Sequence, residues 1–157
     1  MTLEAGQEAP EFDLPAAGGG RARLADFKGR PLVVYFYPKD DTPGCTKEAQ
    51  GFAAAYPEFQ AAGVAVVGVS KDSAASHDRF RAKYDLPFIL ASDEPGGVVE
   101  AYGSWVEKSM YGRKYQGIDR STFLIDQNGT VRQVWRNVKV PGHVAEVLAA
   151  ARALGVA

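Results

Sequence analysis

Three runs of β-branched and aromatic residues constrain the fold of this chain more than any other feature of its sequence. The runs are PLVVYFY, GVAVVGVS and PFILAS, at residues 31–37, 63–70 and 87–92. None of them alternates with polar residues, which is typical of strands that are covered on both faces. The segments between the runs have a helical composition, so strands alternate with helices along the chain. This order predicts an α/β protein whose central sheet is at least partly parallel.

The segments that follow these strands carry recognisable helix signals. Residues 45–61 combine alanines with spaced aromatic residues and are predicted to be helical, although Gly51 and Pro57 weaken that helix. Ser73 is predicted to cap a second helix that ends near residue 84. A short helix is expected over residues 96–103, and a last one over residues 141–154, which begin with a proline that is favourable in a first turn.

Two hairpins are predicted in addition. Residues 11–30 indicate two short strands around a glycine-rich turn, followed by a polar loop. Residues 120–136 contain two apolar runs joined around Asn128 and Gly129, a pair that strongly favours a two-stranded hairpin. The whole pattern predicts one domain over residues 1–157, a three-layer α/β sandwich with a mixed central sheet and an N-terminal hairpin.

Charge and composition exclude several classes of protein. The formal net charge is -1, which gives no electrostatic basis for binding nucleic acid or another polyanion. The N-terminus lacks a basic segment followed by an apolar run, and no stretch approaches the roughly 20 apolar residues of a membrane span. We therefore expect no membrane association and a cytoplasmic location.

Cys45 is the only cysteine, so an internal disulfide is excluded. It lies where a turn meets the predicted helix, and a helix N-terminus lowers the pKa of a thiol there and favours the thiolate. Asp40 and Asp41, just upstream, oppose a thiolate. We expect both carboxylates to face solvent, with Lys39 and Lys47 offsetting their field.

The alternative for Cys45 is a purely structural role. A lone cysteine is commonly buried and behaves as a small apolar residue. Here, however, the neighbours are Pro43, Gly44 and Lys47 rather than an apolar run. This context favours a chemical role.

The stretch YFYPKDDTPGCTKEA contains Pro38, Thr42 and Cys45 at the Pro-x-x-x-Thr-x-x-Cys spacing of the peroxiredoxins, and it resembles their Q-type subfamily, also called bacterioferritin comigratory proteins. APEFDLP, GVSKDS and MYGRKYQGIDRSTFLID resemble the same subfamily, so the similarity covers most of the chain. The resemblance implies a thioredoxin-like fold, in which Cys45 is the peroxidatic cysteine of a peroxidase for hydrogen peroxide and organic hydroperoxides.

The same resemblance implies roles for the neighbouring residues. The Cys45 thiolate would attack the terminal peroxide oxygen and become a sulfenic acid. The Cys45 backbone N–H, the Thr42 hydroxyl and the Arg120 guanidinium would stabilise the charge that develops on oxygen. Pro38 would shield the sulfur from water, and Glu48 would orient Arg120.

Each of these residues also has a simpler interpretation. Thr42 could cap the helix, and Arg120 could be a surface residue of a strand. Glu48 could be a solvated residue of the first helical turn. Tyr37 could line the pocket or merely end its strand.

The chain departs from the subfamily at Gln50, where many members carry a resolving cysteine. The next helix, SAASHDRFRAKY, supplies no cysteine either. The sulfenic acid would then react with an external thiol: a low-molecular-weight thiol such as glutathione, thioredoxin, or a glutaredoxin-like protein. Whether Gln50 is native or an engineered replacement is left open. A monomer is expected, with a dimer as the alternative.

Other functions find less support in the sequence. A peroxide sensor or redox-regulated binding protein would use the same cysteine, but no separate partner-binding element is evident. Without Cys-x-x-Cys, a disulfide oxidoreductase is excluded. No haem, flavin or other cofactor is implied. A metal site is not expected, because His77 and His143 are far apart and are predicted to be surface or capping residues.

Overall fold

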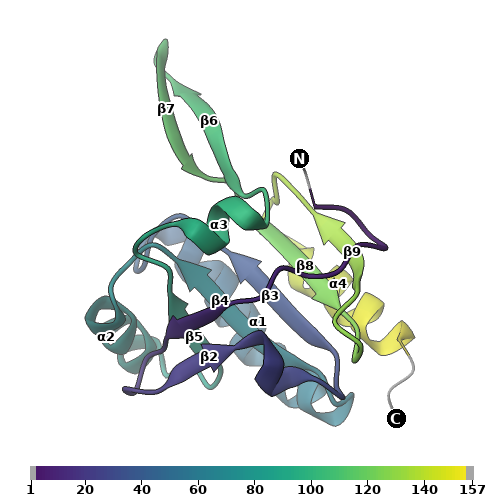
Figure 1. The fold of residues 1–157 in the computed structure, drawn as a ribbon. Coiled ribbons are helices and arrows are strands. Elements are labelled where there is room, and N and C mark those ends of the chain that lie inside the picture. Colours follow the sequence, from purple (N-terminus) through teal and green to yellow (C-terminus); the bar gives the residue numbers. More distant parts are fainter. Residues whose placement is uncertain (1–2, 155–157) are drawn as a thin grey trace.

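The computed structural model describes residues 3–154, whose centre is a five-stranded mixed sheet (Figure 1). Its strand order is β5-β4-β3-β8-β9. The parallel half contains the three predicted runs, as β3 (Leu32–Phe36), β4 (Ala65–Ser70) and β5 (Ile89–Ser92). The antiparallel half is the predicted hairpin, β8 (Ser121–Ile125) and β9 (Val131–Trp135). The mixed α/β sheet predicted from the sequence is confirmed.

Three helices pack against one face of this sheet. They are α1 (Pro43–Ala61), α2 (Ala74–Tyr84) and α4 (His143–Ala153). The Ser73 hydroxyl caps α2 as predicted, accepting a hydrogen bond from the backbone N–H of Ser76 at 3.1 Å. None of the helices within residues 3–154 combines the length and apolarity needed to cross a lipid bilayer.

The opposite face is covered by shorter elements. These are the N-terminal hairpin of β1 (Asp13–Pro15) and β2 (Arg21–Arg23), the 3-10 helix η1 (Leu24–Phe27) and α3 (Gly97–Ala101). Their apolar side chains complete a second core cluster with the sheet. The segment expected to be a polar loop after β2 therefore contributes a buried helical turn, because Leu24 and Phe27 point into this core.

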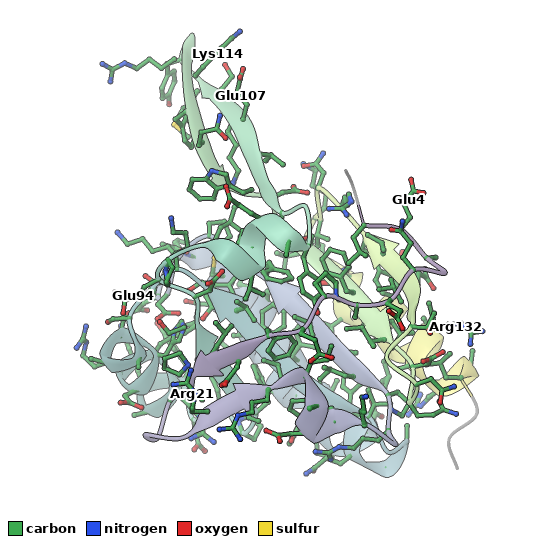
Figure 2. The ribbon with its side chains drawn as sticks, viewed as in Figure 1. Glu4, Arg21, Glu94, Glu107, Lys114 and Arg132 are labelled. Atoms are coloured by element: carbon green, nitrogen blue, oxygen red, sulfur yellow. The ribbon has the colours of Figure 1, made fainter. Side chains whose placement is uncertain are left out.

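A third hairpin, which was not predicted from the sequence, protrudes from the body (Figure 1). It consists of β6 (Trp105–Met110) and β7 (Arg113–Ile118). The two connecting residues, Tyr111 and Gly112, both have positive φ angles, as a tight turn between twisted strands requires. Figure 2 shows the long charged side chains that this hairpin carries away from the sheet. The structure thus contains a mostly exposed hairpin that ends two residues before Arg120.

Candidate active site

The connection from β3 to α1 places Cys45 at the start of a long helix. Thr42 occupies the N-cap position and Pro43 the first turn, where its missing N–H costs nothing. Cys45 follows as the third residue of α1, with 2% of its surface exposed. The N–H groups of a first turn have no acceptor within the helix and carry its positive dipole end. The position is the one predicted from the sequence, and there Cys45 belongs to the core cluster between the sheet and α1 while lying in a first helical turn.

Arg120, which is distant in the sequence, contacts both Cys45 and Glu48 in the folded chain. It directly precedes β8, the antiparallel neighbour of β3, and this pairing brings it to the start of α1. One guanidinium nitrogen, Nη2, donates to Cys45 Sγ at 3.4 Å, while Nη1 donates to Glu48 Oε1 at 2.8 Å. Burial lowers the pKa of Arg120, but the Glu48 and Cys45 anions outweigh it and raise that pKa overall. The guanidinium therefore remains a fixed cation shared by a carboxylate and the sulfur.

Gly44 makes this approach possible. A Cβ atom built at Gly44 would lie 3.1 Å from Nη2 of Arg120. Any larger side chain would push the guanidinium away from the first turn of α1. This role of Gly44 was not predicted, because its close partner lies 76 positions later in the chain and no local sequence pattern indicates it.

Glu48 is completely buried, and this excludes the solvated first-turn residue considered above. Burial raises its pKa to about 7, although Arg120 acts in the opposite direction. One oxygen, Oε1, is held by Arg120, whereas Oε2 has no hydrogen-bond partner among the described residues. Glu48 is therefore placed to orient Arg120. Burying the Glu48 side chain costs more free energy when its carboxyl group is ionised than when it is protonated.

This burial makes stability depend on pH. Between the ordinary value of 4.5 and about 7, the native Glu48 binds a proton that the unfolded chain does not. The free energy of unfolding should therefore fall as pH rises through this interval and level off above it, by on the order of 3 kcal/mol at most. Urea unfolding of the wild type and Glu48→Gln between pH 4.5 and 8 measures the difference. The difference in stability between the two proteins should vary with pH, and a constant difference would contradict the assignment.

Thr42 does not act as a helix cap through its side chain, although it occupies the N-cap position. Its hydroxyl donates to the carbonyl oxygen of Lys39 at 2.9 Å. This bond fixes the hydroxyl oxygen beside the start of α1. The lone pairs of that oxygen remain available to accept a hydrogen bond. The capping interpretation of Thr42 is therefore wrong for its side chain.

Pro38 and Arg120 line an open groove of about 610 Å³, which we call the Arg120 groove. The β6–β7 hairpin and the segment after β9 form its remaining walls. Its other lining residues are Val106, Glu107, Lys108, Ser109, Tyr115, Asp119, Asn137 and Val138. The groove gives a small molecule access to the guanidinium that contacts Cys45. Tyr37 is not among its lining residues.

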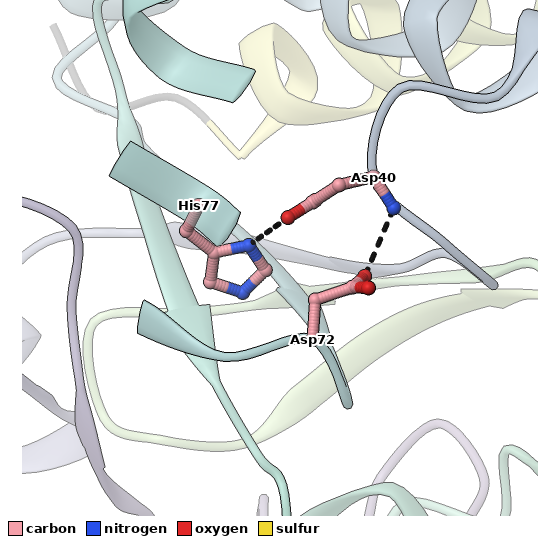
Figure 3. A group of neighbouring side chains, drawn as sticks. All are labelled: Asp40, Asp72 and His77. Atoms are coloured by element: carbon pink, nitrogen blue, oxygen red, sulfur yellow. Dashed lines mark hydrogen bonds and ion pairs between the residues drawn. The ribbon is translucent and has the colours of Figure 1, made fainter. Parts of the chain in front are cut away.

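Tyr37 instead belongs to a buried polar network around Asp40. The Tyr37 hydroxyl donates to Asp40 Oδ1 at 2.6 Å, and Ser76 donates to Oδ2 at 2.8 Å. His77 Nδ1 lies 2.7 Å from the same Oδ2, and the Asp40 backbone N–H donates to Asp72 at 2.9 Å (Figure 3). The network ties the β3–α1 loop to the first turn of α2.

The prediction that both aspartates face solvent is therefore wrong for Asp40, which is buried. Its charge is compensated by hydrogen bonds and by His77 rather than by water. Asp41 is exposed as expected, but it pairs with Lys83 at 2.7 Å and not with Lys39 or Lys47. Residues from α2, distant in the sequence, thus neutralise both carboxylates.

The two histidines are also buried, which corrects their prediction as surface or capping residues. His77 contacts Asp40 through Nδ1 and the Ala91 carbonyl through Nε2, at 2.9 Å. Both ring nitrogens therefore lie at hydrogen-bond distance from an oxygen, one from a carboxylate and the other from a carbonyl. His143 Nε2 lies 2.8 Å from the Thr122 hydroxyl, and burial lowers the pKa of His143.

Asp40, Asp72 and His77 also have the side-chain types of a metal site. Their ligand atoms all lie within 4.8 Å of one another. The hydrogen bonds described above already engage these atoms, so the arrangement is accounted for without an ion. The expectation that the chain binds no metal remains a prediction.

We expect His77→Leu to destabilise the protein, because it removes the ring nitrogen that lies 2.7 Å from Asp40 Oδ2 and leaves this buried carboxylate without one of its partners. The loss in free energy of unfolding should be about 3 kcal/mol, typical of one partner removed from a buried pair. Urea unfolding at pH 7 measures it. Lys83→Ala is the matched control, because it breaks the exposed pair with Asp41 and should have a much smaller effect. Equal effects of both substitutions would contradict the role of the buried network.

Comparisons with known proteins agree with this geometry. Residues 5–134 match the AhpC/TSA family. The putative peroxiredoxin bcp of Coxiella burnetii is 53% identical over 148 residues, which cover 94% of this chain and 98% of that protein. The bacterioferritin comigratory protein of Xanthomonas campestris, whose structures concern alkyl peroxide reduction, has 48% identity and a TM-score of 0.87 over 91% of both chains. A cysteine-to-serine mutant of Xylella fastidiosa PrxQ has 39% identity and a TM-score of 0.93 over 98% of both chains.

Proposed function

This chain belongs to the AhpC/TSA family and is a peroxiredoxin, a thiol-dependent peroxidase, and on that premise we propose that Cys45 is the residue that reduces the peroxide. The observation that carries the proposal is the hydrogen bond from Arg120 Nη2 to Cys45 Sγ at 3.4 Å. Buried Glu48 holds this guanidinium against the sulfur of the only cysteine in the chain, and the thiolate is the nucleophilic form of a cysteine.

The peroxide step is a displacement on oxygen. The Cys45 thiolate attacks the terminal oxygen of a hydroperoxide, an S–O bond forms, and the O–O bond breaks. The departing oxygen takes a proton and leaves as water or an alcohol, while Cys45 becomes a sulfenic acid. Arg120 and the first-turn N–H of Cys45 supply donors where negative charge develops, while the Thr42 hydroxyl, whose own proton goes to the Lys39 carbonyl, offers a lone pair to the proton of the hydroperoxide. Pro38 limits the access of water from the Arg120 groove.

Substrates of this step are hydrogen peroxide and organic hydroperoxides. The Arg120 groove has the volume of a small-molecule site and carries apolar side chains, so an organic group fits beside the peroxide. The study of alkyl peroxide reduction by the Xanthomonas campestris relative, which is 48% identical, supports the same class here.

Reduction of the Cys45 sulfenic acid back to the thiol requires a thiol from another molecule, because the chain has no second cysteine. An external thiol attacks the sulfenic acid, which releases water and leaves a mixed disulfide on Cys45. A second external thiol then attacks the outer sulfur, releases a disulfide and restores Cys45. Thioredoxin, a glutaredoxin-like protein or a low-molecular-weight thiol would serve. This demand for thiols suits a cytoplasmic location, and the cycle requires only a monomer.

Mass spectrometry of Cys45 after one equivalent of hydrogen peroxide tests the function. A sulfenic acid should form stoichiometrically and return to the thiol over many cycles when a thiol is supplied. Comparing thioredoxin, a glutaredoxin-like protein and glutathione then identifies the reductant by rate. Oxidation that occurs only once, with no thiol able to restore Cys45, would indicate a peroxide sensor and contradict the peroxidase cycle.

A further inference from the structure

One face of the β6–β7 hairpin supplies three lining residues of the Arg120 groove, while Glu107 and Ser109 line it from the other face. Val106 and Lys108 lie on this face of β6, opposite Gly117 and Tyr115 of β7. Three of these four residues, Val106, Lys108 and Tyr115, line the Arg120 groove together with Pro38 and Arg120. The hairpin thus forms a wall of the groove, and it carries a lysine there.

Gly117 determines where that lysine points. Lys108 is paired with Tyr115, and Gly117 is the next residue on the same face, one step nearer the base of the hairpin. A Cβ atom built at Gly117 would lie 3.3 Å from Lys108 Cδ and 3.5 Å from Cε. The stem of Lys108 therefore occupies the space that a side chain at 117 would fill, and crosses toward the base of the hairpin, where Arg120 follows β7.

The Lys108 ammonium has no anionic partner within residues 3–154 at ion-pair distance, while Glu107 pairs with Lys114 at 3.6 Å. Asp119 is the nearby carboxylate, and both of its oxygens accept from the Asn137 backbone N–H at 3.2 Å. Burial lowers the pKa of Lys108, Arg120 lowers it further, and the charges of Asp119 and Cys45 oppose this. Lys108 is thus a partly buried cation in the wall of the Arg120 groove.

From this geometry we infer that Lys108 binds the carboxylate of a small organic substrate in the Arg120 groove. The inference rests on the proposed function, because it concerns substrates of the same cysteine. Arg120 is already engaged by Glu48 and Cys45, so Lys108 is the groove cation left to receive an anion. Its single charge matches a carboxylate, while Pro38, Val106 and Val138 offer apolar surface to the organic part.

Two substrates of the cycle could carry this carboxylate, the hydroperoxide and the thiol, and the two half-reactions separate them. The first arm measures single-turnover oxidation of Cys45 by a carboxylated cumene hydroperoxide and by its methyl ester. The second arm measures capture of preformed Cys45 sulfenic acid by 3-mercaptopropionate and by its methyl ester, at equal thiolate concentration. Wild type, Lys108→Gln, Lys108→Arg and Lys114→Gln are compared as full-length proteins.

In the wild type, the acid should react about fivefold faster than the ester in at least one arm, as expected for one partly exposed ion pair. The arm that shows the preference identifies which substrate carries the carboxylate. The ratio should fall to about one in Lys108→Gln and persist in Lys108→Arg. It should also persist in Lys114→Gln, whose substituted side chain is exposed and pairs with Glu107.

A ratio near one in both arms of the wild type would overturn the inference. The inference would also be overturned if Lys108→Gln slowed the reactions of the acid and of the ester by the same factor. An equal effect on both rates would mean that Lys108 acts on Cys45 in general and does not bind the carboxylate. Wild-type oxidation by hydrogen peroxide is recorded in parallel. If no sulfenic acid forms there, the proposed function fails as well. If it forms without preference for the acid, only the role of Lys108 is contradicted.

Discussion

Replacing Cys45 with serine is expected to reduce peroxide turnover to the uncatalysed level. A serine hydroxyl is not ionised near neutral pH and no general base contacts it here, since Arg120 is the polar side chain that meets position 45. The groove and its donors remain in this variant, but the nucleophile is lost. Consumption of hydrogen peroxide, measured with excess thiol, should therefore be indistinguishable from the reaction without protein.

Two controls make this result interpretable. Cys45 is buried in the core cluster beside α1, so unfolding in urea must show that the serine variant is folded. Thr46→Ser retains a hydroxyl one residue later and should keep its turnover. Peroxide reduction by folded Cys45→Ser protein at the wild-type rate would contradict the whole mechanism, because the chain has no other thiol.

The central sheet could be predicted from the sequence because its signals are local. Uninterrupted apolar runs gave β3, β4 and β5, and the Asn128-Gly129 turn gave the β8–β9 hairpin. On the second face the N-terminal hairpin and α3 were predicted, but η1 was expected to be a loop, because its buried residues Leu24 and Phe27 are spaced by only one helical turn. The β6–β7 hairpin was missed because neither of its strands has a buried, apolar face, and exposed strands leave a weak pattern.

The candidate active site was likewise predicted only in part. The position of Cys45 at a helix start followed from Pro43 and the preceding strand, and the resemblance to peroxiredoxins supplied Thr42 and Arg120. What the sequence could not give was the environment of the charges. Asp40 looked solvent-facing because its partners, Ser76 and His77, lie in another helix. Burial of a polar residue is set by such distant partners, and no spacing within one segment encodes it.

Replacing Arg120 with alanine is expected to lower the second-order rate constant for peroxide reduction by more than tenfold. Tenfold corresponds to a rise of about 1.4 kcal/mol in the barrier, and loss of a fixed donor at a developing charge commonly costs about 2 to 4 kcal/mol. Both of the roles assigned to Arg120 disappear, the contact to Cys45 Sγ at 3.4 Å and the positive charge beside the peroxide. Stopped-flow oxidation with varied hydrogen peroxide measures the constant.

The same substitution leaves Glu48 buried without its cation, so a slow variant could also be a damaged one. Glu48→Gln combined with Arg120→Ala removes both ionisable groups and should recover much of the stability lost in Arg120→Ala alone, because no buried acid is left without its partner. Its rate constant should nevertheless stay low. Recovery of the rate along with the stability would show that Arg120 acts only by neutralising Glu48. Recovery of stability alone places its effect at the peroxide and the sulfur.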